Sequence, residues 1–306
     1  MKEKEFINII KKTLNSQYIG DDCAYLKELN IVVTQDSLVE GVHFVRNQMT
    51  AYQLGCKSVS VNISDILASG AEPAYLTIAL SLPEDIDGNF IKEFYKGAKH
   101  AACGAKIVGG DITGSNKIFI SITAIGKTDD RKISSRSHAK VGQKIVVEGM
   151  HGSSAVGLKL LNGETLPEMP DAEKEYFMNI HKVPRILVYP SKAIATTQKR
   201  DYAMMDTSDG LADALFAISE ASGVMMEIDF DKIPCEETVL ELENCEEYIL
   251  YGGEDYGLVA TVDDPLDLNV VGEVKEGSGI KINYEDSSKI ITKSSLEGNL
   301  FDHFKE

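Results

Sequence analysis

Three aspartates lie close together in the segment MDTSDGLADALF, which spans residues 205–216. Asp206 and Asp209 flank a serine where an apolar strand is expected to turn into a helix, and Asp213 follows one helical turn later. Like charges at this spacing repel each other unless something neutralises them. A structural role is also open, because Ser208 and Asp209 are good N-cap residues and a helix N-terminus favours acidic groups.

The same kind of acidic segment recurs along the chain. Acidic residues follow glycines, follow apolar strands or lie on an apolar helix at Asp21, Asp22, Asp36, Asp65, Asp111, Glu254 and Asp255. Acids at strand ends project from the edge of a sheet, where ligand sites are built, and glycines let a ligand approach the backbone. Mg²⁺ suits such a cluster, because it binds carboxylates and completes its coordination with water and phosphate oxygens. The sequence therefore predicts a site that holds several Mg²⁺ ions and a polyphosphate.

Several familiar motifs are missing from the sequence. It contains no GxxxxGK[ST] P-loop, no GxGxxG after a strand, no HExxH and no GxSxG. The segment GMHGSSAVGLKLL, residues 149–161, follows a strand and opens a helix, so its amides could hold a phosphate. A plain tight connection between strand and helix is an equally good interpretation.

Composition excludes some classes of partner. The chain has 306 residues, with 31 Lys and Arg against 48 Asp and Glu, and a formal net charge of −17. Such a surface is poorly suited to nucleic acid or an anionic membrane, and we expect neither as a partner. The five cysteines form no CxxC pair, and we find no secretory signal and no apolar run long enough to span a membrane. A cytoplasmic protein is therefore expected.

Strand and helix patterns alternate in both halves of the chain. The length favours two domains, and the polar stretch 127–143 is the best candidate for their boundary, giving domains 1–138 and 139–306. Each half is predicted to be a mixed sheet with helices packed on it, of the α/β or α+β class. A helix is expected near 184–197, and the acidic segment 164–175 is expected to be an exposed loop.

Taken together, the motifs resemble the thiamine-monophosphate kinase family, in the superfamily of aminoimidazole ribonucleotide synthetase and selenophosphate synthetase. The resemblance runs nearly end to end, in IGDDCAYL, TQDSLVEGVHF, NISDILASGAEPAYLTIAL, VGGDIT, SRSHAKVGQ, MDTSDGL, YGGEDYGL and FDHF. It implies a kinase that uses ATP and several Mg²⁺ ions to phosphorylate thiamine monophosphate to thiamine diphosphate. It also implies an N-terminal domain that dimerises through its sheet, and a larger α/β C-terminal domain.

The resemblance also implies roles for individual residues. Mg²⁺ ligands of the family match Asp22, Thr34, Gln35, Asp36, Asp65, Asp111, Asp206 and Asp209. Its ATP contacts match Gly110, Asp111, Arg136 and Ser208, and its substrate contacts match His43, Glu254 and Phe301. The predicted catalytic residues are Asp65, Asp111, Arg136 and Asp209.

The sequence departs from the family pattern in places. Gln35 stands where Thr is usual, which changes little if the backbone carbonyl is the ligand, and Phe301 stands where Tyr is expected. The segment HKVPR, residues 181–185, is shorter than the family's HxxPxPR, so we assign no role to His181 or Arg185.

Alternatives remain at the level of residues and of function. Asp21 is expected to bond within its turn rather than bind metal. From the residues alone, His43 could simply be packed and Arg136 solvated. The alternative functions are another ATP-dependent synthetase of the superfamily and a non-catalytic nucleotide-binding dimer.

Overall fold

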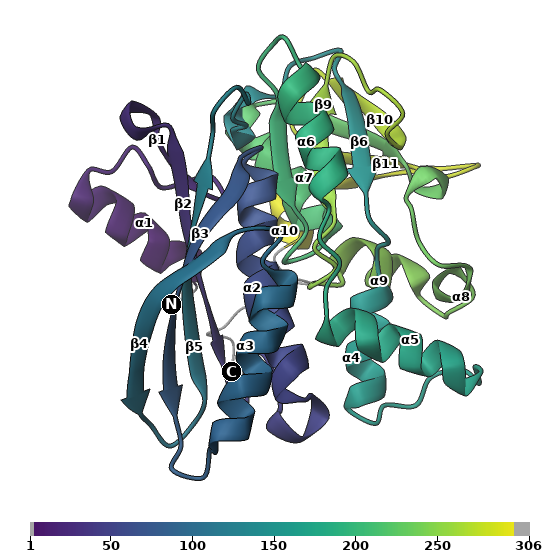
Figure 1. Cartoon of the computed structure of the whole chain (residues 1–306). Helices are drawn as coiled ribbons and strands as arrows, with labels where there is room; N and C mark the ends of the chain where they lie inside the picture. The colour runs from purple at the N-terminus through teal and green to yellow at the C-terminus, as the bar shows by residue number, and fades with distance from the viewer. Residues whose placement is uncertain (1–2, 297–306) are drawn as a thin grey trace.

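The first half of the chain forms a five-stranded sheet. A computed structural model describes residues 3–296 (Figure 1), so Phe301 lies outside the described residues. The strands, in the order β1–β2–β5–β3–β4, are β1 (Ala24–Leu26), β2 (Ile31–Val39), β3 (Glu72–Leu82), β4 (Lys106–Gly114) and β5 (Phe119–Lys127). The pair β3–β4 is parallel and the other pairs are antiparallel, as predicted for a mixed sheet.

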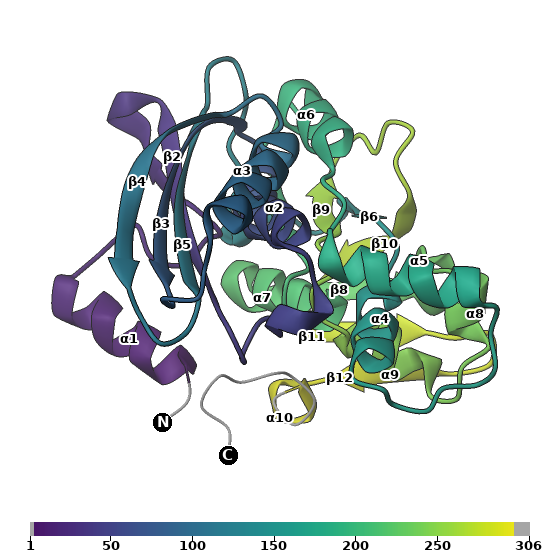
Figure 2. The ribbon, with the colours of Figure 1, turned by 60° about the horizontal axis from the view of Figure 1, so that its bottom comes forward.

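Two helices, α2 (Ala51–Ala68) and α3 (Gly88–Ala101), cover one face of this sheet (Figure 2). The two helices approach closely at a pair of glycines. A Cβ at Gly55 would lie 2.0 Å from the Phe94 carbonyl oxygen, and one at Gly97 would lie 1.9 Å from that of Tyr52. Because α2 lies between the sheet and the second half of the chain, nearly all of its side chains are buried. Polar groups on α2 therefore project into the interior of the protein.

The second half forms a seven-stranded, mostly antiparallel sheet in the order β12–β11–β8–β10–β6–β9–β7. Its strands are β6 (Lys144–Glu148), β7 (Ala203–Asp206), β8 (Met225–Asp229), β9 (Leu258–Val262), β10 (Val270–Lys275), β11 (Gly279–Asn283) and β12 (Ser288–Ile291). The remaining helices are α1 (Glu3–Leu14), α4 (Ser153–Leu161), α5 (Asp171–Lys182), α6 (Val188–Thr197), α7 (Leu211–Ser222), α8 (Glu237–Leu240), α9 (Cys245–Tyr251) and α10 (Lys293–Leu296).

Several local predictions were wrong. The segment 164–175 is not all loop, because α5 begins at Asp171, directly after Pro170, and buries Phe177. A proline before a helix and acids in its first turn favour a helix start there. The helix expected near 184–197 is confirmed as α6, with its start at Val188. The strands β2 and β4 are longer than expected, so their aspartates lie inside strands rather than at strand ends.

An apolar contact joins the two halves. Ala68 at the end of α2 clusters with Ile194 of α6, Met204 of β7 and Leu258 of β9. The buried Tyr202 hydroxyl donates to the Lys132 carbonyl oxygen at 2.6 Å. The two sheets are thus fixed relative to each other, which places residues from both halves around α2.

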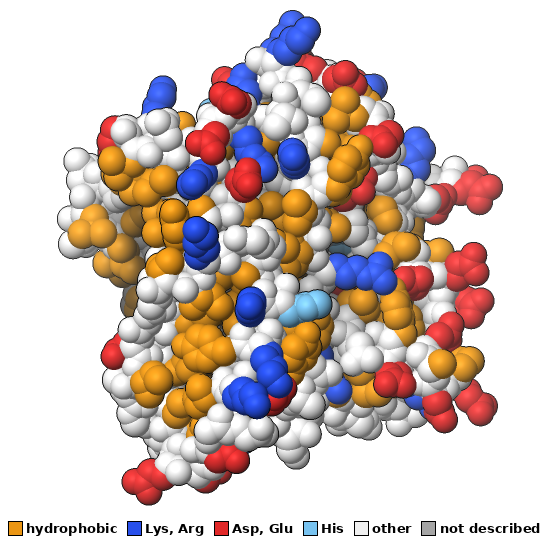
Figure 3. Space-filling view, in the orientation of Figure 1, with side chains coloured by type: hydrophobic (Ala, Val, Ile, Leu, Met, Phe, Trp, Pro, Cys, Tyr) orange, Lys and Arg blue, Asp and Glu red, His pale blue; other side chains and the backbone are white. Residues whose placement is uncertain are grey.

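The surface view shows how charge is distributed over one face of the molecule. Acidic side chains gather along the edge of the second half where α5 and α8 lie (Figure 3).

Among the described residues, no helix is long and apolar enough to cross a membrane.

Candidate metal and substrate site

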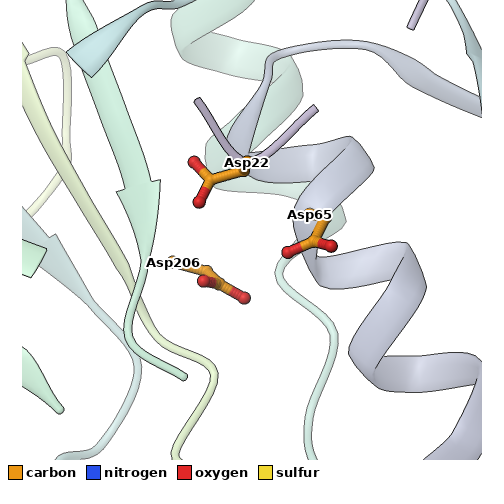
Figure 4. Close-up of side chains that lie close together, drawn as sticks. All are labelled: Asp22, Asp65 and Asp206. Carbon is orange, nitrogen blue, oxygen red and sulfur yellow. The ribbon is translucent and has the colours of Figure 1, made fainter. Parts of the chain in front are cut away.

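Three carboxylates from distant parts of the sequence converge beside α2 (Figure 4). Asp22 precedes β1, Asp65 lies on α2, and Asp206 is the last residue of β7. Ligand oxygens of the three lie within 4.8 Å of one another. These residues are called the carboxylate cluster below.

Burial makes the charged form of this cluster costly. Burial, together with the charges of Asp36 and Asp206, raises the pKa of Asp65 well above its ordinary value. Burial and the charge of Asp22 raise the pKa of Asp206 to about 7. Carboxylates in this state need a proton or a cation. Since all the donors are hard oxygens, the cluster fits Mg²⁺.

Hydrogen bonds hold the cluster in place. The Thr34 hydroxyl donates to Asp65 Oδ2 at 2.7 Å, and the Ser64 hydroxyl donates to Asp206 Oδ2 at 2.6 Å. Asp36 lies on β2, and its charge acts on both Asp65 and Asp206. Five of the eight predicted metal positions are thus gathered at one place: Asp22, Thr34, Asp36, Asp65 and Asp206. Sequence reasoning missed Ser64.

Arg136 provides a cation at the edge of the cluster. Its guanidinium lies 2.7 Å from Asp22 Oδ1. Its amide donates to Asp21 Oδ1 at 2.8 Å, and the Ser135 hydroxyl donates to the same oxygen at 3.2 Å. Asp21 therefore fixes the loop that carries Arg136. The prediction that it bonds within its own turn was wrong, because its partners lie in a distant segment of the chain. Among the described residues, no atom accepts a hydrogen bond from the buried Arg136 Nε.

The turn after β7 is tied to the segment that carries Glu254. The Glu254 amide donates to the Ser208 carbonyl oxygen at 2.7 Å, and Glu254 has a positive φ of 64°. The neighbouring Gly253 leaves no room for a side chain, because a Cβ there would lie 2.9 Å from the same oxygen. Ser208 is half-buried and Asp209 is exposed on this turn.

Glu254 is paired with a buried lysine that the sequence analysis did not single out. Lys57 on α2 has no exposed surface, and its Nζ lies 3.0 Å from Glu254 Oε1. His181 of α5 also contacts this pair, 3.3 Å from Lys57 Nζ and 3.4 Å from Glu254 Oε2. Burial raises the pKa of Glu254, but the charge and hydrogen bond of Lys57, together with the two nearby histidines, outweigh burial, and the net pKa is lowered. A charged residue inside an apolar helix pattern was the signal available in the sequence.

His43 lies near the same carboxylate. Its Nδ1 accepts a hydrogen bond from the Val39 amide at 3.0 Å. Its charge contributes, after that of Lys57 and His181, to lowering the pKa of Glu254. The structure therefore brings together two of the three predicted substrate residues.

Two predicted metal ligands face the other way. Asp36 pairs across the sheet with Ile122 of β5 and so shares its face, toward α2. Asp111 pairs with Ala79, which pairs with Ser121, on the opposite, open face of the sheet. The Gln35 side chain also lies on that open face, where it bonds Ser121 at 3.2 Å. Asp111 and the Gln35 side chain therefore lie on the face of the sheet that points away from the carboxylate cluster.

Gly110 is confined by packing within the sheet. A Cβ there would lie 1.7 Å from the Ile78 carbonyl oxygen, so the strand pairing itself requires glycine. Its predicted ATP contact stays a prediction.

The N-terminus of α4 is capped by the protein itself. Asp255 Oδ2 accepts from the Gly152 amide at 2.6 Å, and Oδ1 accepts from the Ser154 amide at 2.8 Å. These amides are therefore used by a carboxylate, which favours the plain connection over a phosphate cradle. A cavity of about 370 Å³, lined by Asp255, Ser153 and Arg185 among others, lies beside this turn.

The chain matches two known domain families. Residues 20–128 match the AIR synthase related protein, N-terminal domain, and residues 140–285 match the AIR synthase related protein, C-terminal domain. The chain is thus a two-domain protein of the AIR synthase related class.

Known relatives narrow this class. Thiamine-monophosphate kinase of Aquifex aeolicus (strain VF5) is 36% identical over 301 residues, covering 94% of this chain and 95% of that protein. The Bacillus subtilis (strain 168) enzyme is 33% identical over 307 residues, covering 94% and 93%. The solved structure of AaThiL complexed with AMPPCP and TMP matches with a TM-score of 0.85 at 33% identity, over 99% of this chain and 97% of that one. The chain therefore belongs to the thiamine-monophosphate kinase family, which confirms the resemblance.

Proposed function

We propose that this protein transfers the γ-phosphoryl group of ATP to the phosphate of thiamine monophosphate, giving thiamine diphosphate and ADP. The carboxylate cluster carries this proposal, because the cluster lies in a chain of this kinase family and burial keeps the pKa values of its acids raised despite the contact with Arg136. The relative in complex with AMPPCP and TMP supports both substrates.

The residues divide the work between the two substrates. Asp22, Asp65 and Asp206 would hold Mg²⁺, with Thr34 orienting Asp65 and Ser64 orienting Asp206. Bound Mg²⁺ would reduce the repulsion between the two anionic phosphates. Asp36 and Asp209 are proposed as further ligands.

The nucleotide side of the site would involve Arg136 and Ser208. The Arg136 side chain is 24% exposed, so its guanidinium could donate a hydrogen bond to a phosphate oxygen. His43, Glu254 and Phe301 are proposed to hold the thiamine end.

The transfer itself needs little from the protein beyond alignment. An oxygen of the acceptor phosphate, already ionised near neutral pH, forms the new bond to the γ-phosphorus as the bond to the β–γ bridging oxygen breaks. No strong general base is required, and in-line geometry with charge neutralisation lowers the barrier.

A homodimer is proposed to complete the site. Asp111 lies on the open face of the first sheet, so it could serve a carboxylate cluster only from a second copy of the chain. Exposed apolar residues on this sheet, with Val108 59% and Ile112 63% exposed, support association through it.

The test is direct. Purified protein is incubated with ATP, thiamine monophosphate and MgCl₂, and thiamine diphosphate is measured by chromatography. Formation of thiamine diphosphate and ADP in equal amounts is expected. ATP hydrolysis without thiamine diphosphate, or no reaction, would refute the proposal.

A further inference from the structure

The buried Lys57 contacts a carboxylate that reaches solvent. Lys57 has no exposed surface and His181 is 4% exposed, whereas the Glu254 side chain is 26% exposed. Of these three residues, called the lysine network below, Glu254 is the one that a ligand can reach. Lys57 and His181 can therefore influence a ligand only through Glu254.

The contacts of Lys57 and His181 restrain that carboxylate. Lys57 Nζ donates to Glu254 Oε1 at 3.0 Å and, since an ammonium is a donor, His181 Nε2 must accept from it at 3.3 Å. The imidazole proton then lies on Nδ1, which is hydrogen-bonded to the Ser154 hydroxyl at 3.0 Å and lies 3.4 Å from Glu254 Oε2. One buried ammonium thus positions one carboxylate oxygen directly and sets the tautomer of the histidine that lies beside the other oxygen.

The backbone at Glu254 is restrained as well. Its backbone φ of 64° lies in the left-handed region. Residues other than glycine adopt this conformation rarely, and then where the surrounding structure imposes it. The amide bond to Ser208 and the lysine network both act on this residue. Together they give the carboxylate a single orientation relative to the turn after β7.

One helix connects the two parts of the site. Lys57 and Asp65 both lie on α2, eight residues apart, which corresponds to about 12 Å along the helix axis. Movement of α2 would displace the carboxylate cluster and Glu254 together. The spacing between the phosphate-transfer end and the organic end of a substrate is therefore determined by a single rigid element.

Stability alone is a poor reason for this arrangement. Well-packed apolar residues in place of a buried ion pair are often neutral or stabilising. The negative charge of Glu254 also adds little attraction for a ligand, because the Lys57 ammonium already neutralises it. A fixed hydrogen-bond acceptor is what the pairing provides.

We propose that Lys57 is a positioning residue for thiamine monophosphate, which aligns the Glu254 carboxylate as a hydrogen-bond acceptor for the thiamine end of the substrate. This inference rests on the proposed function. It predicts that loss of Lys57 weakens binding of thiamine monophosphate and leaves binding of ATP unchanged.

The experiment compares Lys57→Met with Lys132→Met. Lys132 also joins the two halves of the chain, through Asp201 at 3.1 Å and the Lys199 carbonyl oxygen at 2.8 Å, but away from the site. Lys57→Met is expected to raise the KM for thiamine monophosphate about 10- to 100-fold, with the KM for ATP within about twofold. Lys132→Met should change neither constant.

A double substitution separates positioning from a general structural effect. In a Glu254→Gln background, Lys57→Met should add less than about twofold to the KM for thiamine monophosphate, because both changes remove the same interaction. Additive effects, an equal rise in both KM values, or an unchanged KM for thiamine monophosphate would overturn the proposal.

Two controls keep the result decisive. If Lys57→Met does not fold, His181→Gln, which leaves Lys57 an acceptor, takes its place, and a selective rise of about 3- to 10-fold is expected. An unchanged KM in that variant would overturn the inference. Wild-type protein that forms no thiamine diphosphate would refute the proposed function and the inference together, whereas an active wild type with unselective variants would refute the inference alone.

Discussion

The carboxylate cluster and the lysine network lie against the same helix, but burial has a different outcome for the acids in each. In the lysine network, Lys57 and the nearby histidines together outweigh the effect of burial, and the pKa of Glu254 is lowered. In the cluster, Arg136 contacts Asp22, yet burial still raises the pKa of Asp22, Asp65 and Asp206.

This difference shows which acids the folded chain neutralises by itself. The lysine network is complete within the protein, so its carboxylate can be ionised and held still without any ligand. The carboxylate cluster is incomplete and is expected to take up protons or a divalent cation. A search for metal sites by acidic residues alone would have assigned Glu254 and the carboxylate cluster to the same site. Burial and the pairing with Lys57 distinguish Glu254 from the cluster.

The largest expected effect comes from neutralising the cluster. Asp65→Asn and Asp206→Asn should each lower kcat at least about a hundredfold, because an Mg²⁺ ligand is lost where charge must be balanced. In EDTA at pH 8 the same variants should melt about 2–5 °C higher than wild type, because like-charge repulsion is reduced. Steady-state kinetics at saturating Mg²⁺ and thermal melts measure the two effects. Near wild-type turnover in either variant would remove that residue from the metal site.

The pH dependence of stability should report the same contrast. A carboxyl whose folded-state pKa is raised stabilises the fold less as pH rises from its unfolded pKa to its folded pKa. For Asp206, with a folded pKa of about 7 against an ordinary 3.8, this window runs from pH 4 to 7. In EDTA the free energy of unfolding should therefore fall by on the order of 2–4 kcal/mol between pH 5 and 8.

Added Mg²⁺ should reverse this loss. Because the ion needs deprotonated ligands, the Mg²⁺-induced rise in melting temperature should be larger at pH 8 than at pH 5. Full turnover in excess EDTA, or a Mg²⁺ shift of equal size at both pH values, would contradict the metal assignment.

Neutralising the acid of the lysine network should destabilise the protein, whereas neutralising an acid of the cluster should stabilise the metal-free protein. Glu254→Gln leaves the Lys57 ammonium buried without its carboxylate, so we expect a loss of about 2 kcal/mol in the free energy of unfolding at pH 8. Denaturant unfolding in EDTA, run beside Asp65→Asn, compares the two directly. If both substitutions stabilise the protein, the two regions do not differ as described.

Sequence reasoning predicted most of the elements and the acids of the cluster. Apolar strands and glycine-bounded helices have clear patterns, and the acids of MDTSDGL and IGDDCAYL stood out against them. The start of α5 at Asp171 was missed because its charged segment resembles a loop until the buried Phe177 and His181 are known.

Pairing across the fold was less accessible. Lys57 was overlooked because a single lysine on a helix is usually exposed, and nothing local shows that α2 is covered on all sides. The face of Asp111 depends on a register shift in the β3–β4 pairing between Leu76 and Thr77, which one sequence does not reveal. Such features arise from tertiary packing rather than from local pattern.

The smallest expected effect concerns the acid beside the cluster. Asp21 is adjacent to Asp22 in the sequence, but its Oδ1 accepts from the Ser135 hydroxyl and the Arg136 amide rather than facing Asp65 and Asp206. An asparagine oxygen can accept the same two hydrogen bonds. Asp21→Asn should therefore change the free energy of unfolding by about 0.5 kcal/mol or less and kcat by no more than about twofold.

Asp22→Asn is the matched comparison for this prediction. It removes a member of the carboxylate cluster and the partner of the Arg136 guanidinium, so kcat should fall as in Asp65→Asn while Asp21→Asn stays active. Each variant loses one negative charge, and the two positions are adjacent in the sequence. A general electrostatic effect would therefore lower kcat equally in both variants. Equal losses of kcat in the two variants would mean that the cation site extends to Asp21, and that the boundary between structural and metal-binding acids lies elsewhere.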